Sequence, residues 1–249
     1  MKVSKYFQEF LMLLVVLERA TGLQVSNLFS KVLGTTIDNN CRLALQVPAS
    51  TKFLGLRGAC SLMCMQNKNC RFFCTLKSTG ACALYSAYVA VRWPGQVGVT
   101  YDACYTSWGD PRDILKTNSP FNFSTNYPTF HDNYIHATDG YSCSEIQNRF
   151  GTELRSNSYS QIDLEQITRV QTVIFATANL GFLEDVDVYL SNTSDFTIGE
   201  KIGRVDGKPP GWSSITISTN TSVAGRYITF FMAVNNYHGY AEIQIIPLP

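Results

Sequence analysis

Short bursts of alternating apolar and polar residues recur along the C-terminal half of the chain. A period of two is typical of half-buried antiparallel strands, whose successive side chains point to opposite faces of a sheet. Turn-forming residues separate the bursts, and no helical pattern interrupts them. The pattern predicts an all-β unit, a β-sandwich or jelly roll, over 113–249. The expected strands are 160–164, 170–175, 186–190, 215–218, 227–230 and 242–245.

The N-terminal half shows a helical segment followed by two strands. Cys60 and Cys64 lie four residues apart, so on a helix they share one face, and Leu56 and Met63 are their apolar neighbours. Residues 70–76 and 81–85 are the expected strands of a hairpin whose turn is at 77–80. We therefore predict an α+β module, a helix on an antiparallel sheet, over 23–107, with a linker at 108–112.

All eight cysteines lie between Cys41 and Cys143, and the last hundred residues have none. Such a cluster indicates either a disulfide framework or a zinc site. Zinc sites usually show paired Cys-x-x-Cys or histidine spacings, which this segment lacks. We therefore expect disulfides that stabilise the fold of the N-terminal module and take no part in catalysis.

The first 22 residues have the pattern of a secretory signal peptide. Lys2 and Lys5 precede an apolar run at 10–17, and small residues follow at 20–22. The alternative is a buried first helix. The run is shorter than the roughly 20 apolar residues of a membrane helix, and no later stretch approaches that length, so we expect no transmembrane segment. The mature protein is expected to be secreted, with N-glycosylation sequons at Asn122, Asn192 and Asn220.

Charge and motifs argue against two broad classes of function, nucleic-acid binding and catalysis. The chain has 20 basic and 19 acidic residues, and without residues 1–22 it has 17 of each, so no excess of positive charge favours nucleic acid. The sequence holds three histidines and lacks a Gly-x-Ser-x-Gly elbow, an HExxH zinc motif and a phosphate-binding glycine loop. We therefore expect a binding protein rather than an enzyme.

Residues 51–85 combine a helix carrying Cys60-x-x-x-Cys64, a cysteine at Cys70, an aromatic residue after it, and the strand Cys82-Ala83-Leu84. This combination resembles the PAN/apple family, whose members bind proteins or carbohydrates. The nested disulfide pattern of that family implies three pairs here: Cys60–Cys82, Cys64–Cys70 and Cys41–Cys104. Cys74 lies outside the pattern and Cys143 is the cysteine left for it, so we expect a Cys74–Cys143 bridge between the two domains.

Five phrases of the C-terminal half occur in a fixed order: 137–140, 159–164, 167–175, 225–228 and 241–245. Together they resemble the discoidin-like, galactose-binding-like superfamily, which includes coagulation-factor type C domains and fucolectins. The resemblance implies a calcium ion held by Asp139 and Glu242, together with backbone carbonyls. The alternative is that Asp139 caps a turn and Glu242 is a solvated strand residue.

Fucolectins hold their sugar with one His and two Arg, and this triad has no match here: residues 176–183 carry no Arg and residues 145–152 carry no His. A sugar site would instead be assembled from donors and a ring in two loops. The alternative is a hairpin turn with solvated side chains. The candidate sugar-binding residues are Arg149, Arg155, Asn236, Tyr237 and His238.

Leu180, Phe182 and Leu183 form an apolar tip in a predicted loop, and Trp212 follows a second turn. Either the tip is exposed and inserts into a membrane or a protein, as in coagulation-type discoidin domains, or it folds back onto the barrel mouth. We expect a lectin-like recognition or adhesion protein that binds glycans on cells, microbes or matrix. The alternative is a protein- or phospholipid-binding module that uses this tip and has no sugar site.

Overall fold

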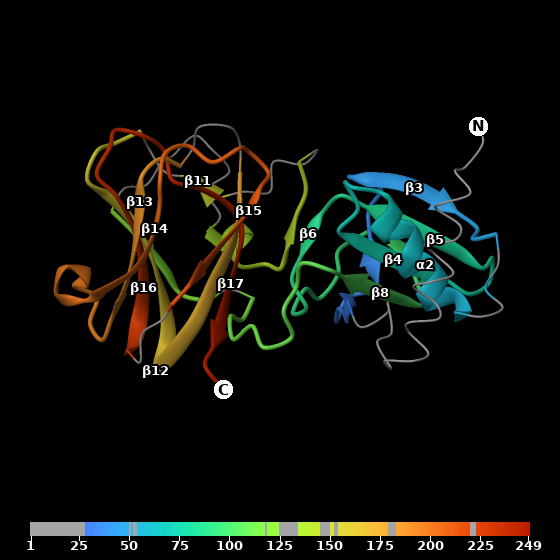
Figure 1. Ribbon diagram of the computed structural model, residues 1–249, viewed down its shortest axis with the longest axis horizontal. Coiled ribbons are helices and arrows are strands. Elements are labelled where there is room, and N and C mark those ends of the chain that lie inside the picture. The colour runs from blue at the N-terminus through green and yellow to red at the C-terminus, as the bar shows by residue number, and fades with distance from the viewer. Residues whose placement is uncertain are drawn as a thin grey trace, which may run out of the picture.

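A computed structural model describes residues 28–249 apart from 50, 52–53, 118, 125–133, 145–149, 152–153, 179–182 and 220–222. The chain forms two halves that lie next to each other, a helix-bearing module and a β-sandwich (Figure 1). The predicted fold class is confirmed in both halves. The predicted signal peptide lies outside the described residues. Within the described part of the chain, no helix is long and apolar enough to cross a membrane.

The N-terminal module consists of one helix, α2 (Gly55–Gln66), packed on a five-stranded antiparallel sheet (Figure 1). The sheet order is β1-β8-β4-β5-β3, and a separate pair of short strands, β2 (Thr36–Ile37) and β7 (Val99–Thr100), lies outside it. The strands of the sheet are β1 (Ser30–Lys31), β3 (Arg42–Gln46), β4 (Phe72–Leu76), β5 (Ala81–Tyr85) and β8 (Ala103–Thr106).

Two disulfides fix helix α2, as the resemblance to the PAN/apple family implied. Cys60 and Cys64 are fully buried on the face of the helix that packs on the sheet. The Cys60–Cys82 bridge ties the helix to β5, and the Cys64–Cys70 bridge ties its last turn to the segment before β4. A module of this size gains a large share of its stability from such covalent links.

The other two disulfides differ from the prediction. The structure pairs Cys74 with Cys104 and Cys41 with Cys143, so the expected Cys41–Cys104 and Cys74–Cys143 bridges are wrong. The reason is register: Cys74 on β4 lies directly opposite Cys104 on β8, with 4.0 Å between their Cα atoms. The bridge between the two halves therefore starts from Cys41, which immediately precedes β3.

The sandwich is organised by one long strand, β12 (Ser158–Thr177). Its first part pairs with β9 and β16, and its last part pairs with β15 and β17, so the strand passes from one layer to the other. The pairing with β16 shifts register between Asp163 and Thr168, where Glu165 has a φ of 64°, and the pairing with β17 begins at Val170. Strands that switch sheets at such irregularities are common in orthogonally packed sandwiches. The two strands expected at 160–164 and 170–175 are therefore one bent strand.

The remaining strands of the sandwich complete the two layers. One layer has β9, β12, β16, β13 and β14, and the other has β15, β12, β17 and β11. Their bounds are β9 (Phe121–Phe123), β11 (Phe150–Gly151), β13 (Val186–Ser191), β14 (Glu200–Val205), β15 (Ser214–Ser218), β16 (Ala224–Met232) and β17 (Gly239–Pro247).

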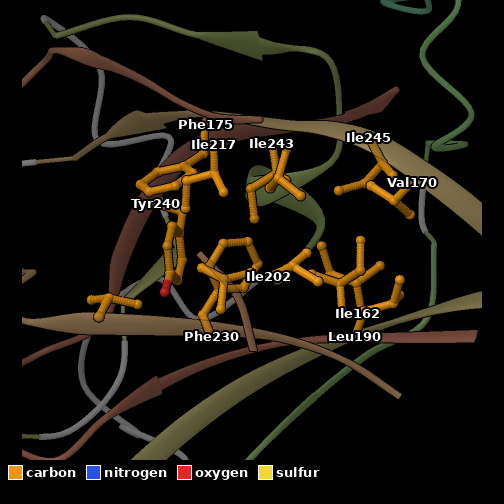
Figure 2. Packing of buried hydrophobic residues seen from close by; sticks show 14 of the residues in the cluster. Ile162, Val170, Phe175, Leu190, Ile202, Ile217, Phe230, Tyr240, Ile243 and Ile245 are labelled. Carbon is orange, nitrogen blue, oxygen red and sulfur yellow. The ribbon is translucent and has the colours of Figure 1, made fainter. Parts of the chain in front are cut away.

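The core of the sandwich lies between these layers. In Figure 2, Phe175, Ile243 and Ile245 from one layer face Phe230 and Leu190 from the other. The rings of Phe175 and Phe230 meet edge to face at 5.5 Å between centroids, a favoured aromatic geometry. The interior positions follow the period of two seen in the sequence, because each strand turns alternate side chains inward.

Candidate binding site

The two halves are joined by a short two-stranded sheet. Strand β6 (Tyr88–Val89) pairs with β10 (Tyr141–Ser142), which follows the 3-10 helix η2 (Tyr134–Ala137). In Figure 1, β6 lies between the sandwich and the helix-bearing module. Beside this sheet the Trp93 ring stacks on the Tyr141 ring with 5.3 Å between centroids, and the Cys41–Cys143 disulfide closes the junction. Segments from both halves therefore meet in fixed register.

A groove of about 250 Å³ opens at this junction. Its lining combines an indole and a phenol with hydroxyl, amide and guanidinium groups. We call it the junction groove, and it is lined by Leu43, Asn69, Arg71, Ser86, Tyr88, Ser142, Ser144 and Trp212.

Contacts from both halves hold the aromatic wall of the junction groove. The Tyr88 hydroxyl donates to the backbone oxygen of Trp212 at 2.6 Å, and the Trp108 ring meets the Tyr88 ring edge to face at 5.3 Å. Trp212 has a φ of 56°, a conformation that is rare for bulky residues. Its N–H donates to the Ala178 oxygen at 3.0 Å, which fixes this backbone. Trp212 thereby lines the groove from a constrained turn.

Arg71 supplies the positive charge of the junction groove. Its guanidinium lies 4.3 Å above the Tyr88 ring and donates to the Ser86 oxygen at 2.9 Å. Burial raises the pKa of the Tyr88 phenol, while the charge of Arg71 opposes that shift, so the phenol stays neutral at physiological pH. The groove therefore offers hydrogen-bond donors and acceptors beside an aromatic surface. The lining residues include no carboxylate, histidine or thiol that would serve as a general acid, a base or a nucleophile.

The two predicted calcium ligands lie close to the junction but are already engaged by the protein. The Asp139 carboxylate accepts from the Tyr141 N–H at 2.9 Å and contacts the His136 ring at 3.0 Å. Glu242 is fully buried and accepts from the Gly140 N–H at 2.8 Å. Asp139 thus has the turn-capping contact of the alternative interpretation, whereas a solvated Glu242 is contradicted by its burial.

Positive charge next to Glu242 comes from Arg92 in the N-terminal half. The Arg92 guanidinium forms ion pairs with Glu242 and Asp113 and also donates to the Ile243 oxygen at 2.8 Å. Among the described residues, no group of three or more His, Cys, Asp or Glu side chains is placed to hold a metal ion.

The residues predicted to form a sugar site in the sandwich loops differ in their exposure to solvent, so they do not form one accessible surface. Arg155 is exposed and forms a β-bridge with Asn236, which is buried and donates to Glu184 at 3.1 Å. Tyr237 is half-buried beside them. His238 is fully buried between Ser158 and Tyr240, so its prediction as a ligand contact is wrong. Arg149 lies outside the described residues.

The predicted apolar tip is described only at its last residue. Leu183 is 2% exposed and packs in the core of the sandwich, which agrees for this residue with the alternative in which the tip folds back and contradicts the one in which it is exposed. Leu180 and Phe182 lie outside the described residues. Asn122 and Asn192 are exposed, which leaves their sequons accessible to modification, and Asn220 lies outside the described residues.

Sequence reasoning identified Trp212 but missed the other lining residues of the junction groove. Arg71, Ser86 and Tyr88 lie in the N-terminal half, in which no individual binding residue was predicted. Ser142 and Ser144 flank Cys143, so the correct disulfide pairing would have directed attention to them. The groove forms where the two halves meet, so the sequence of either half alone contains only some of its lining residues.

No protein-family model matches the chain, and no curated protein matches it. Among solved structures, a fucolectin from the serum of striped bass (Morone saxatilis) is 20% identical, with a TM-score of 0.49 over 54% of this chain and 48% of the fucolectin. The chain thus matches less than half of the fucolectin's length. A fucose binding module of Streptococcus pneumoniae is 15% identical, with a TM-score of 0.44 over 55% of this chain and 95% of that module. The module CBM32-1 of a Clostridium perfringens family 31 glycoside hydrolase is 15% identical, with a TM-score of 0.45 over 55% of this chain and 99% of the module.

Proposed function

We propose that this protein is a secreted, non-catalytic glycan-binding protein whose sugar site is the junction groove. The observation that carries the proposal is the lining of the groove, where the Trp212 indole lies among hydroxyl, amide and guanidinium groups. Binding sites for small polar ligands combine an apolar wall with a few fixed polar groups. The four disulfides support an oxidising, extracellular setting.

The size and charge of the junction groove narrow the ligand class. Its volume of about 250 Å³ is below the roughly 300–1,000 Å³ of pockets for drug-sized ligands, so it suits one sugar ring of a longer glycan. Arg71 is the single charged residue of the lining. A guanidinium binds carboxylate and sulfate groups by paired hydrogen bonds. We therefore expect glycans that carry an acidic group to bind more tightly than neutral ones.

The backbone of Trp212 gives further support. Sparsely populated backbone conformations occur preferentially at binding and catalytic sites, where the surrounding structure maintains them. Here two hydrogen bonds from different parts of the chain hold the positive φ of Trp212. A tryptophan held in this way offers a rigid surface for the apolar face of a sugar.

A glycan array probed with the mature protein tests the proposal, with Trp212→Ala, Arg71→Gln and Tyr237→Ala measured in parallel. We expect Trp212→Ala to weaken retention about tenfold or more, equivalent to at least ~1.4 kcal/mol. Arg71→Gln should remove the preference for acidic glycans. Tyr237→Ala is the matched control, because it removes a half-buried aromatic ring from the sandwich loop instead.

Two results would overturn the proposal. One is the absence of binding above background to every glycan, and the other is retention that Tyr237→Ala abolishes and Trp212→Ala leaves intact. Thermal unfolding of each variant verifies that a lost signal does not come from a lost fold.

A further inference from the structure

Arg92 reaches from the N-terminal half into a cluster of oxygen atoms in the sandwich. It is one-tenth exposed, and its guanidinium forms ion pairs with the carboxylates of Asp113 and Glu242, which are 2% and 0% exposed. It also donates to the backbone oxygens of Thr138 at 3.2 Å and Ile243 at 2.8 Å. Two carboxylates and two carbonyls therefore surround one cationic side chain.

The backbone around Arg92 fixes its position. Ala90 donates to the Gly140 oxygen at 2.8 Å, next to the β6–β10 pair. Gly140 has a φ of 91°, and a Cβ built there would lie 2.8 Å from the Cα of Trp93. Only glycine permits this close approach. The segment that carries Arg92 is thus held against residues 138–142 of the other half.

The buried carboxylates of Asp113 and Glu242 require a positive charge between them, which Arg92 supplies. Burial raises the pKa of the Glu242 carboxyl and lowers that of the Arg92 guanidinium, and the attraction between the two charges opposes both shifts. Without a positive charge, the buried carboxylates of Asp113 and Glu242 would lack a counter-ion in a medium that solvates them poorly, and the charge of Asp139 also disfavours an ionised Glu242.

We infer that the Arg92 guanidinium is the built-in cation of this cluster, which takes the place of a metal ion and locks the two halves together. Carboxylates and backbone carbonyls are the ligands that calcium prefers, at 2.3–2.6 Å. Here the guanidinium nitrogens donate to those oxygens, so a calcium ion has no free carboxylate at Glu242. The expected calcium site therefore does not fit this chain. The inference is independent of the ligand of the junction groove.

Thermal unfolding of the mature, disulfide-intact protein tests the inference. The melting temperature of the wild type should be the same in millimolar calcium and in excess chelator. Arg92→Met should lower the melting temperature by about 10 °C, because it leaves two buried carboxylates without their cation. The matched control is Arg204→Met, since Arg204 forms ion pairs at the surface with Asp185, Asp187 and Asp206. That variant should lose no more than about 3 °C.

A second substitution separates charge balance from loss of packing. Glu242→Gln introduced into Arg92→Met should raise the melting temperature above that of Arg92→Met alone, because it removes one uncompensated charge. If Arg92→Met does not fold, recovery of folded protein in the double variant is the supporting result. A wild-type melting temperature that rises with calcium would overturn the inference, as would an Arg92→Met variant no less stable than Arg204→Met. Failure of Glu242→Gln to rescue Arg92→Met would also overturn it.

Discussion

His238 shows at the scale of one residue how burial changes the role of a side chain. Its Nε2 lies 3.1 Å from the Ser158 backbone oxygen and its Nδ1 lies 3.0 Å from the Tyr240 hydroxyl. A neutral imidazole that donates from Nε2 and accepts at Nδ1 satisfies both contacts. Burial lowers the pKa of His238 to about 4. In the sequence His238 lies among turn-forming residues, which is why it was predicted to contact a ligand.

Because of this shift, stability should fall in acid. The unfolded chain binds a proton at His238 near its ordinary pKa of about 6.5, whereas the folded protein binds it only near 4. The unfolded state therefore holds more protons between these values, so the free energy of unfolding should drop as the pH falls from about 6.5 to 4. The expected loss is up to about 3 kcal/mol. Urea unfolding of the wild type over this range measures it.

The control for this prediction is His238→Gln, which keeps hydrogen-bonding capacity and removes the titration. Its absolute stability will be lower, so the comparison is the slope of stability against pH. We expect a flatter slope than in the wild type between pH 4 and 6.5. Equal slopes would show that other groups cause the acid sensitivity.

At the scale of elements, the alternation of apolar and polar residues predicted the strands well. Each expected strand of the sandwich lies within an observed one, because alternation directly reflects which face of the strand is buried. The bend of β12 was not predictable from the same pattern. No glycine or proline marks 164–167, and it is the packing of two layers that places Glu165 at a positive φ.

For the disulfides too, pairs between elements close in the chain were predicted correctly, and pairs between elements far apart in the chain were not. Cys60–Cys82 and Cys64–Cys70 join neighbouring elements, and both agree with the pairing implied by the PAN/apple resemblance. The partner of Cys74 depends on the strand order of the sheet, which puts β4 next to β8. The family pattern assigned Cys41 to Cys104 and left Cys74 for Cys143, and nothing in the spacing of the cysteines indicated that β4 and β8 are neighbours, so the two longer pairs were assigned wrongly. A peptide map of the non-reduced protein should link Cys41 to Cys143.

Removing the Cys41–Cys143 bridge should loosen the junction and lower stability. The bridge spans 102 residues, for which the chain-entropy model gives roughly 4.7 kcal/mol. We expect the double variant Cys41→Ser/Cys143→Ser to lose about 2–5 kcal/mol of unfolding free energy and to bind glycan more weakly. The control is Cys60→Ser/Cys82→Ser, which removes the bridge between α2 and β5, because neither cysteine is adjacent in the chain to a lining residue of the junction groove. If both double variants bound glycan like the wild type, the disulfide would have no part in forming the groove.

For the whole molecule, the candidate site is a property of the junction. The Trp212 indole comes from the sandwich, Arg71 and Tyr88 come from the other half, and Arg92 and Cys41–Cys143 hold the two in place. Sequence reasoning expected a disulfide between the two halves but searched for binding residues only within each half. Of the candidates it named, Trp212 alone lies in the groove lining. A site built from two domains is visible only once their relative placement is known.

Amide hydrogen exchange, measured with and without the best-retained glycan of the array, tests the central claim most directly. The account predicts slower exchange in both halves at once, at 69–72 and 86–89 on one side and at 141–144 and 211–214 on the other. Protection confined to the sandwich loops at 154–157 and 233–238 would contradict it.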